Sequence, residues 1–179
     1  MRKVLTLSVS TLIILTLACN PNPKAIKEGH DKVIIQLPNQ NYSGNIHEIT
    51  LYVNTSEITQ TTTEEYADFR QPYYVPNKDY TTYVSKGDII IWRGVSVTDT
   101  LDTVNITRIQ HHKGKELLGK NVLHGNDGSP EMVVGLIGKD KSVDNDLDHE
   151  KYILHLTVFN NGVKRNGNFK IDPKLLPDY

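Results

Sequence analysis

Apolar and polar side chains alternate along much of this chain, in short runs that end in turn-forming residues. The segment 33–37 carries apolar residues at every second position, and the segment 47–53 repeats the pattern before Asn54-Thr55-Ser56. A period of two is typical of strands with one buried face. The same reasoning predicts further strands at 81–85, 88–93, 103–109, 132–137, 152–159 and 168–171.

Helical periodicity is weak throughout, and only the stretch between Thr61 and Phe69 has room for a turn or two of helix. Several short strands joined by Gly, Asn and Asp clusters are typical of a β-sandwich. We therefore expect an all-β fold, a single Greek-key-type sandwich over 32–179. Trp92 follows the unbroken apolar run 89–91, which suits a central strand, and it is the predicted core anchor.

The C-terminal part predicts a hairpin and a docked tail. Asn160-Asn161-Gly162 tolerates the positive φ angles of a tight turn, so the following strand should carry Phe169 and Ile171 inward. Pro173 and Pro177 limit strand pairing beyond it. The tail 171–179 is therefore expected to lie along the sandwich edge, with Leu175 or Leu176 docked.

A family resemblance supports the sandwich. The segment 84–92, Val-Ser-Lys-Gly-Asp-Ile-Ile-Ile-Trp, resembles the V-x-x-G-D-x-x-x-W stretch of cupredoxin-like domains, which are Greek-key sandwiches. An immunoglobulin-like sandwich is the other architecture that fits the strands. Blue copper cupredoxins bind copper through one Cys, two His and usually a Met. Here the single Cys19 precedes the domain, so the resemblance implies the fold without copper electron transfer, and we expect no cofactor.

The N-terminus has a different pattern. Met1-Arg2-Lys3 precedes an apolar stretch from Val4 to Leu17, and Ala18 stands before Cys19. This order is that of an export signal, and the apolar stretch is shorter than the roughly 20 residues that a membrane-spanning helix needs. It resembles a bacterial lipoprotein signal, in which the cysteine is acylated with diacylglycerol and begins the mature chain. An ordinary secretory signal is the alternative.

Cys19 is the single cysteine, so it has no disulfide partner within the chain, and lipidation would give it a use. We therefore expect a signal peptide at 1–18, a lipidated cysteine with a flexible tether at 19–31, and the sandwich after it. Acyl chains would hold the protein at the bilayer surface. Asn20 after the cysteine favours the outer membrane in the enterobacterial version of this pathway. The expected location is thus the bacterial cell envelope.

Charge and motifs exclude several classes of function. Lys and Arg number 20 against 21 Asp and Glu, with no long basic run, so nucleic acid is not an expected partner. The chain has no G-x-S-x-G, no H-E-x-x-H and no phosphate-binding P-loop, so we expect no enzyme. A hydrolase with its site on separate loops is one alternative, and it requires a His and a carboxylate that converge in one cleft.

Histidines offer a second alternative, an envelope protein that binds a transition metal. The candidate ligands are His111, His112, His124 and His155. The adjacent pair points to opposite faces of a strand unless the chain bends there. His155 is expected on the face of its strand opposite Leu154, where it can face water.

Tyrosines give the leading candidate for a contact surface. Tyr73, Tyr74 and Tyr80 lie in the proline-bounded loop 71–80, and Tyr83 is close by. Tyrosine provides rigid contact area with a polar tip, and such loops often contact sugars or proteins. The alternative is that the rings only cap one end of the sandwich. Our leading hypothesis is a non-enzymatic binding or structural module that presents this loop to a protein or glycan.

Two tripeptides suggest a modification. Asp99-Thr100-Leu101 and Asp102-Thr103-Val104 both resemble the acceptor sequence of a general O-glycosylation system in some Gram-negative bacteria. The resemblance implies Thr100 and Thr103 as the residues that would carry the glycan.

Overall fold

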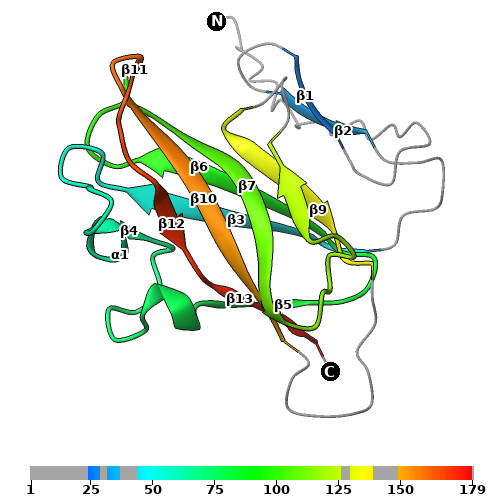
Figure 1. Cartoon of the computed structure of the whole chain (residues 1–179). Coiled ribbons are helices and arrows are strands. Elements are labelled where there is room, and N and C mark those ends of the chain that lie inside the picture. Colours follow the sequence, from blue (N-terminus) through cyan, green and yellow to red (C-terminus); the bar gives the residue numbers. More distant parts are fainter. Residues whose placement is uncertain (1–23, 29–31, 37–43, 126–129, 139–148, 179) are drawn as a thin grey trace, which may run out of the picture.

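In the computed structural model, the regular secondary structure of the described residues is almost all β-strand (Figure 1). It describes residues 24–28, 32–36, 44–125, 130–138 and 149–178. The predicted signal peptide and Cys19 lie outside the described residues. No helix in the described segments is long and apolar enough to cross a membrane.

Thirteen strands and two short helices are defined in the described residues. They are β1 (Lys24–Glu28), β2 (Lys32–Gln36), β3 (Ile46–Val53), α1 (Thr63–Tyr66), β4 (Ala67–Asp68), the 3-10 helix η1 (Asn77–Asp79), β5 (Thr81–Val84), β6 (Ile89–Ser96), β7 (Thr103–Gly114), β8 (Val122–His124), β9 (Met132–Leu136), β10 (Glu150–Asn160), β11 (Val163–Lys164), β12 (Phe169–Ile171) and β13 (Lys174–Pro177). Every strand predicted from the alternation is present, and the single predicted helix is α1.

Two mixed sheets make up the body of the protein. One has the order β5-β13-β10-β7-β8, with β11 and β12 also paired to β10, and the other has the order β4-β3-β6-β9. β3 runs parallel to β6, and β13 runs parallel to β5, whereas the other pairings are antiparallel. β1 and β2 form a separate two-stranded sheet, so part of the expected tether pairs as a strand. The prediction of an all-β sandwich is confirmed.

The core between the two sheets is centred on Trp92, as predicted. Trp92 is fully buried on β6, and its indole Nε1 donates to the Tyr152 hydroxyl on β10 at 3.0 Å. The two rings meet edge to face, with centroids 5.6 Å apart. This contact satisfies two polar atoms that would otherwise be orphaned in an apolar interior, and it joins one sheet to the other.

The C-terminal predictions are partly confirmed. Asn161 and Gly162 adopt positive φ angles of 48° and 80° between β10 and β11, and Phe169 and Ile171 are buried. Leu175 is fully buried as expected. The tail nevertheless forms β13, which pairs with both β5 and β10, so the expectation that the prolines limit strand pairing in the tail was wrong. The prolines only flank the strand: one precedes it and the other is its last residue.

Candidate functional site

A tight turn presents two of the four candidate tyrosines at the tip of the loop between β4 and β5. The Val75 amide donates to the Pro72 carbonyl at 2.8 Å, which closes a β-turn with Tyr73 and Tyr74 at its centre. Tyr73 is 99% exposed and Tyr74 is 73% exposed. We call residues 72–75 the tyrosine turn. Its loop stands out from the edge of the sandwich (Figure 1).

Two amide side chains, Gln71 and Asn77, hold the base of this loop. Gln71 Nε2 donates to Asn77 Oδ1 at 2.7 Å and to the Val75 carbonyl at 3.1 Å. Gln71 Oε1 accepts from the Phe69 amide at 2.8 Å, and Asn77 Nδ2 donates to the Ala67 carbonyl at 2.7 Å. We call this pair the amide clasp. Because the clasp satisfies backbone groups on both arms of the loop, the exposed rings project from an ordered base.

The structure separates the four candidate tyrosines. Tyr80 stacks on Phe69 with centroids 4.3 Å apart and packs against the core, so it supports the loop from below. Tyr83 is 55% exposed on β5, outside the tyrosine turn. The rings of Tyr73 and Tyr74 are 5.6 Å apart and inclined at 82°. The sequence alone did not distinguish the two tip residues from the supporting one, because their different burial depends on how the loop folds.

His111 and His112 lie at a bend in β7. The register with β10 shifts there, so that Tyr152 pairs with His111 while Lys151 pairs with Lys113. His111 Nδ1 is 3.1 Å from Oε1 of Glu150, which is fully buried and accepts two backbone amides through its other oxygen. Burial raises the pKa of Glu150 despite these bonds. His111 therefore belongs to a structural cluster around the Glu150 carboxylate, whereas the adjacent His112 lines a cleft beside α1.

The other two candidate histidines lie on different strands. His124 is exposed on β8, and His155 on β10 is only 8% exposed, which corrects the expectation that His155 faces water. Burial lowers the pKa of His155, and the nearby Arg108 guanidinium lowers it further. Among the described residues, no group of three or more His, Cys, Asp or Glu side chains is placed to hold a metal ion.

A cleft of about 420 Å³ lies beside α1 and contains the combination that the hydrolase alternative requires. His112, Glu64 and Asp172 line it together with Lys170 and Ile153. Burial raises the pKa of Glu64, and the Asp172 carboxylate raises it further. No hydrogen bond joins His112 to either carboxylate within the described structure. The cleft thus brings a histidine and two carboxylates together without a hydrogen bond, among the described residues, that orients the imidazole toward either of them.

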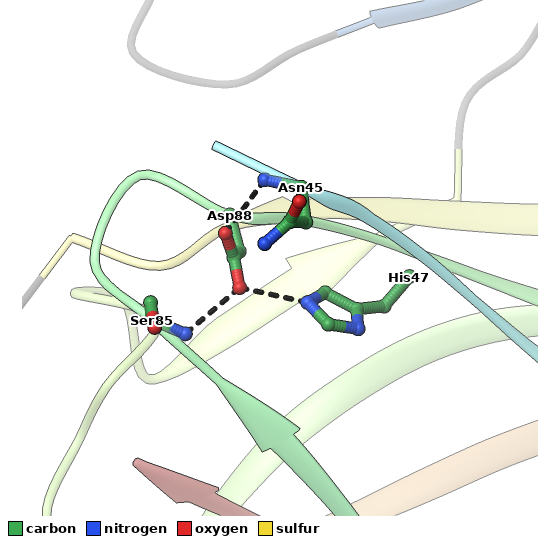
Figure 2. Close-up of polar contacts among 4 residues, drawn as sticks. All are labelled: Asn45, His47, Ser85 and Asp88. Atoms are coloured by element: carbon green, nitrogen blue, oxygen red, sulfur yellow. Dashed lines mark hydrogen bonds and ion pairs between the residues drawn. The ribbon is translucent and has the colours of Figure 1, made fainter. Parts of the chain in front are cut away.

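A further histidine–carboxylate contact, which sequence reasoning missed, ties β3 to β6. Asp88 Oδ2 accepts from the Ser85 amide at 2.8 Å and lies 2.7 Å from His47 Nε2. Its Oδ1 accepts from the Asn45 amide at 2.7 Å, and Figure 2 shows how the four residues converge. Burial alone would raise the pKa of Asp88, but these hydrogen bonds together hold it below its ordinary value. The sequence signal was the Gly87-Asp88 turn. Two of the three partners, Asn45 and His47, precede Asp88 by 43 and 41 residues, so the sequence did not show them as neighbours.

The two candidate glycosylation sites differ in accessibility. Thr100 and its neighbour Leu101 are exposed in the loop before β7. Thr103 is also exposed, but the Asp102 carboxylate next to it accepts from Thr55, Asn160 and the Asn161 amide, and Val104 is buried. The tripeptide centred on Thr100 is therefore the more open of the two.

Comparisons with known proteins give little guidance. No protein-family model matches this chain, and no curated protein matches it either. The crystal structure of the inclusion body protein PixA from Burkholderia cenocepacia has a TM-score of 0.47 at 10% identity, covering 78% of this chain and 99% of that one. The McoA multicopper oxidase from Aquifex aeolicus has a TM-score of 0.30 at 14% identity, covering 83% of this chain and 34% of that one.

Proposed function

We propose that this chain is a non-enzymatic binding module of the bacterial cell envelope, and that the tyrosine turn is its contact surface for a partner protein. One observation carries the proposal: Tyr73 and Tyr74 are exposed side by side on a turn whose base is hydrogen-bonded by the amide clasp. Exposing two large rings to water has no benefit for folding. A preorganised aromatic tip lowers the entropic cost of association.

The geometry favours a protein over a glycan. The two rings are inclined at 82°, so they do not form one flat platform on which a sugar ring could lie. They stand at the convex tip of a turn, which suits insertion into a concave pocket. Tyrosines that fill such pockets are among the residues that contribute most to protein–protein affinity.

The membrane anchor is the second part of the proposal. The sequence at 1–19 supports export and acylation of Cys19, and the short segment after it would hold the sandwich near the outer membrane. The intact mass of the protein from its host membranes should show a diacylglyceryl-type gain on a chain that begins at Cys19. The gain should be lost in Cys19→Ala, and a mature chain without lipid would refute the anchor.

Site-specific photocross-linking in the host envelope tests the binding surface. A photoreactive phenylalanine analogue in place of Tyr73 should give one dominant adduct, and the same analogue in place of Tyr83 is the matched control on a nearby strand. We expect peptide fragments of a partner protein in the adduct from position 73 and not from position 83. An adduct made of glycan would replace the proposed partner class, and equal labelling from both positions would refute the tyrosine turn as the contact surface.

A further inference from the structure

Four side chains with basic groups line up across four neighbouring strands on the outer face of the larger sheet. His124 on β8 pairs with Arg108 on β7, Arg108 pairs with His155 on β10, and His155 pairs with Lys170 on β12. Directly opposed residues share one face of a sheet with Cβ atoms about 5 Å apart. The four residues, which we call the cationic row, therefore extend over about 14 Å. Figure 1 shows β12, β10 and β7 side by side.

The neighbouring row shows which face this is. Leu123, Ile109, Leu154 and Ile171 occupy the next position on the same four strands and pair with one another, and all four are buried in the core. Since successive side chains on a strand point to opposite faces, the cationic row lies on the face away from the core.

The central histidine has an unusual environment. His155 is 8% exposed, and its Nε2 is one of three buried side-chain polar atoms without a hydrogen-bond partner in the described part of the chain. A buried polar atom of this kind is costly unless something else satisfies it. The charged groups that act on His155 are Arg108 and Lys170, one from each flanking strand, and both are cationic.

The two cations, Arg108 and Lys170, have no ion-pair partner among the described residues. Glu64 and Asp172 line the cleft that Lys170 borders, and Asp172 is two residues further along the chain. The row itself thus carries two cations without ion-pair partners in the part of the chain that the structure describes, although the formal net charge of the whole chain is −1.

We propose that the cationic row is an oxyanion-binding site that takes a phosphate or sulfate group. The Arg108 guanidinium offers a fork of donors that matches two oxygens of such a group. The Lys170 ammonium supplies a second charge, and His155 supplies a donor once its imidazole is protonated. The same arrangement disfavours a metal ion at His124 and His155, because Arg108 stands between them. This site is independent of the tyrosine turn.

Calorimetric titration of the purified protein with sodium sulfate and inorganic phosphate tests the site. We expect saturable binding that weakens at least tenfold in Arg108→Gln and in Lys170→Gln. The matched control is Lys164→Gln, an exposed lysine on β11 whose loss changes the net charge equally and should leave the affinity unchanged. All three residues are exposed, so these variants should fold. No saturable binding, or an equal loss in Lys164→Gln, would overturn the proposal.

A pH series with sulfate provides a second readout. Sulfate stays dianionic between about pH 8 and about pH 5.5, so a change in affinity reports the protein and not the ligand. Sulfate should raise the pKa of His155, read from its imidazole ¹⁵N chemical shifts, and its affinity should increase as the pH falls. A His155 pKa that does not change with sulfate would contradict the assignment of His155 to the site.

Vesicles distinguish the two sources of the phosphate group. Flotation with phosphatidylglycerol–phosphatidylcholine vesicles that is lost in Arg108→Gln and Lys170→Gln would assign the site to a lipid headgroup. Saturable binding of free phosphate without flotation would assign it to a soluble phosphate-bearing ligand.

Discussion

Asn77→Ala removes one half of the amide clasp while it leaves both exposed tyrosines in place. Asn77 is 3% exposed, and its side chain links the Ala67 carbonyl to the Gln71 amide. Alanine can make neither bond. The substitution therefore tests whether the order of the loop, and not only its ring area, supports binding.

The expected magnitude follows from these contacts. Each lost hydrogen bond costs about 1 kcal/mol net, and a buried acceptor left without a partner adds about 1–3 kcal/mol. Ala67 is buried, so the substitution leaves its carbonyl as a buried acceptor that has lost the Asn77 donor. We expect the free energy of unfolding to fall by about 3–5 kcal/mol. If two tyrosine side chains must then be ordered on binding, affinity falls by about tenfold to a hundredfold.

Three measurements separate these effects. Urea denaturation gives the global stability, and hydrogen exchange at the Val75 amide reports the turn, since that amide donates to Pro72. The yield of photocross-linking from position 73 reports binding. Asn166→Ala, at an exposed loop asparagine, is the control and should change none of them. Unchanged protection of Val75 in Asn77→Ala would refute the role assigned to the clasp.

Three further predictions concern other parts of the structure. Asp88→Asn should lower the free energy of unfolding by about 2–4 kcal/mol in urea denaturation, because charge-assisted bonds from two amides and His47 are weakened; an unchanged midpoint would contradict the description of this contact. The pKa of His155 is lowered in the folded state, so the unfolded chain binds more protons; its contribution to stability is complete above about pH 6.5 and is lost as the pH falls toward the folded pKa. Stability of His155→Gln should therefore depend less on pH between about pH 7 and about pH 5, and an equal slope in both proteins would count against this reasoning. If the protein is O-glycosylated in its host, mass spectrometry should find the glycan on Thr100 before Thr103, and the reverse order would contradict the accessibility argument.

The sequence predicted the elements whose signal is local. Alternation over five or more residues located the long strands, and the run before Trp92 identified the core. The strands β4, β8, β11 and β13 have two to four residues and were not predicted, because so short a segment shows little periodicity. The equally short β5 and β12 were predicted from their apolar residues and the turn-forming residues that bound them. The tail strand was missed for a second reason, because its pairing depends on two distant strands and not on its own residues.

The candidate sites depend on contacts that one sequence does not display. The tyrosine cluster was visible as a composition, but the clasp that orders its tip joins Gln71 to Asn77 through side-chain geometry. The cationic row requires the register of four strands, and a shift of one residue would move each side chain to the other face. Two of its members, His124 and His155, were noted in the sequence as possible metal ligands. The sequence does not show that Arg108 lies between them, because the three residues become neighbours only in the folded sheet.

The most direct test of the proposed function is the affinity of the partner captured by cross-linking for three proteins: the parent, Tyr73→Ala/Tyr74→Ala, and Tyr83→Ala. Losing a buried tyrosine anchor costs about 2 kcal/mol or more, so the double variant should bind at least about thirtyfold more weakly. Tyr83→Ala should bind like the parent. Equal affinity of the parent and the double variant would contradict the claim that this chain binds its partner through the tyrosine turn.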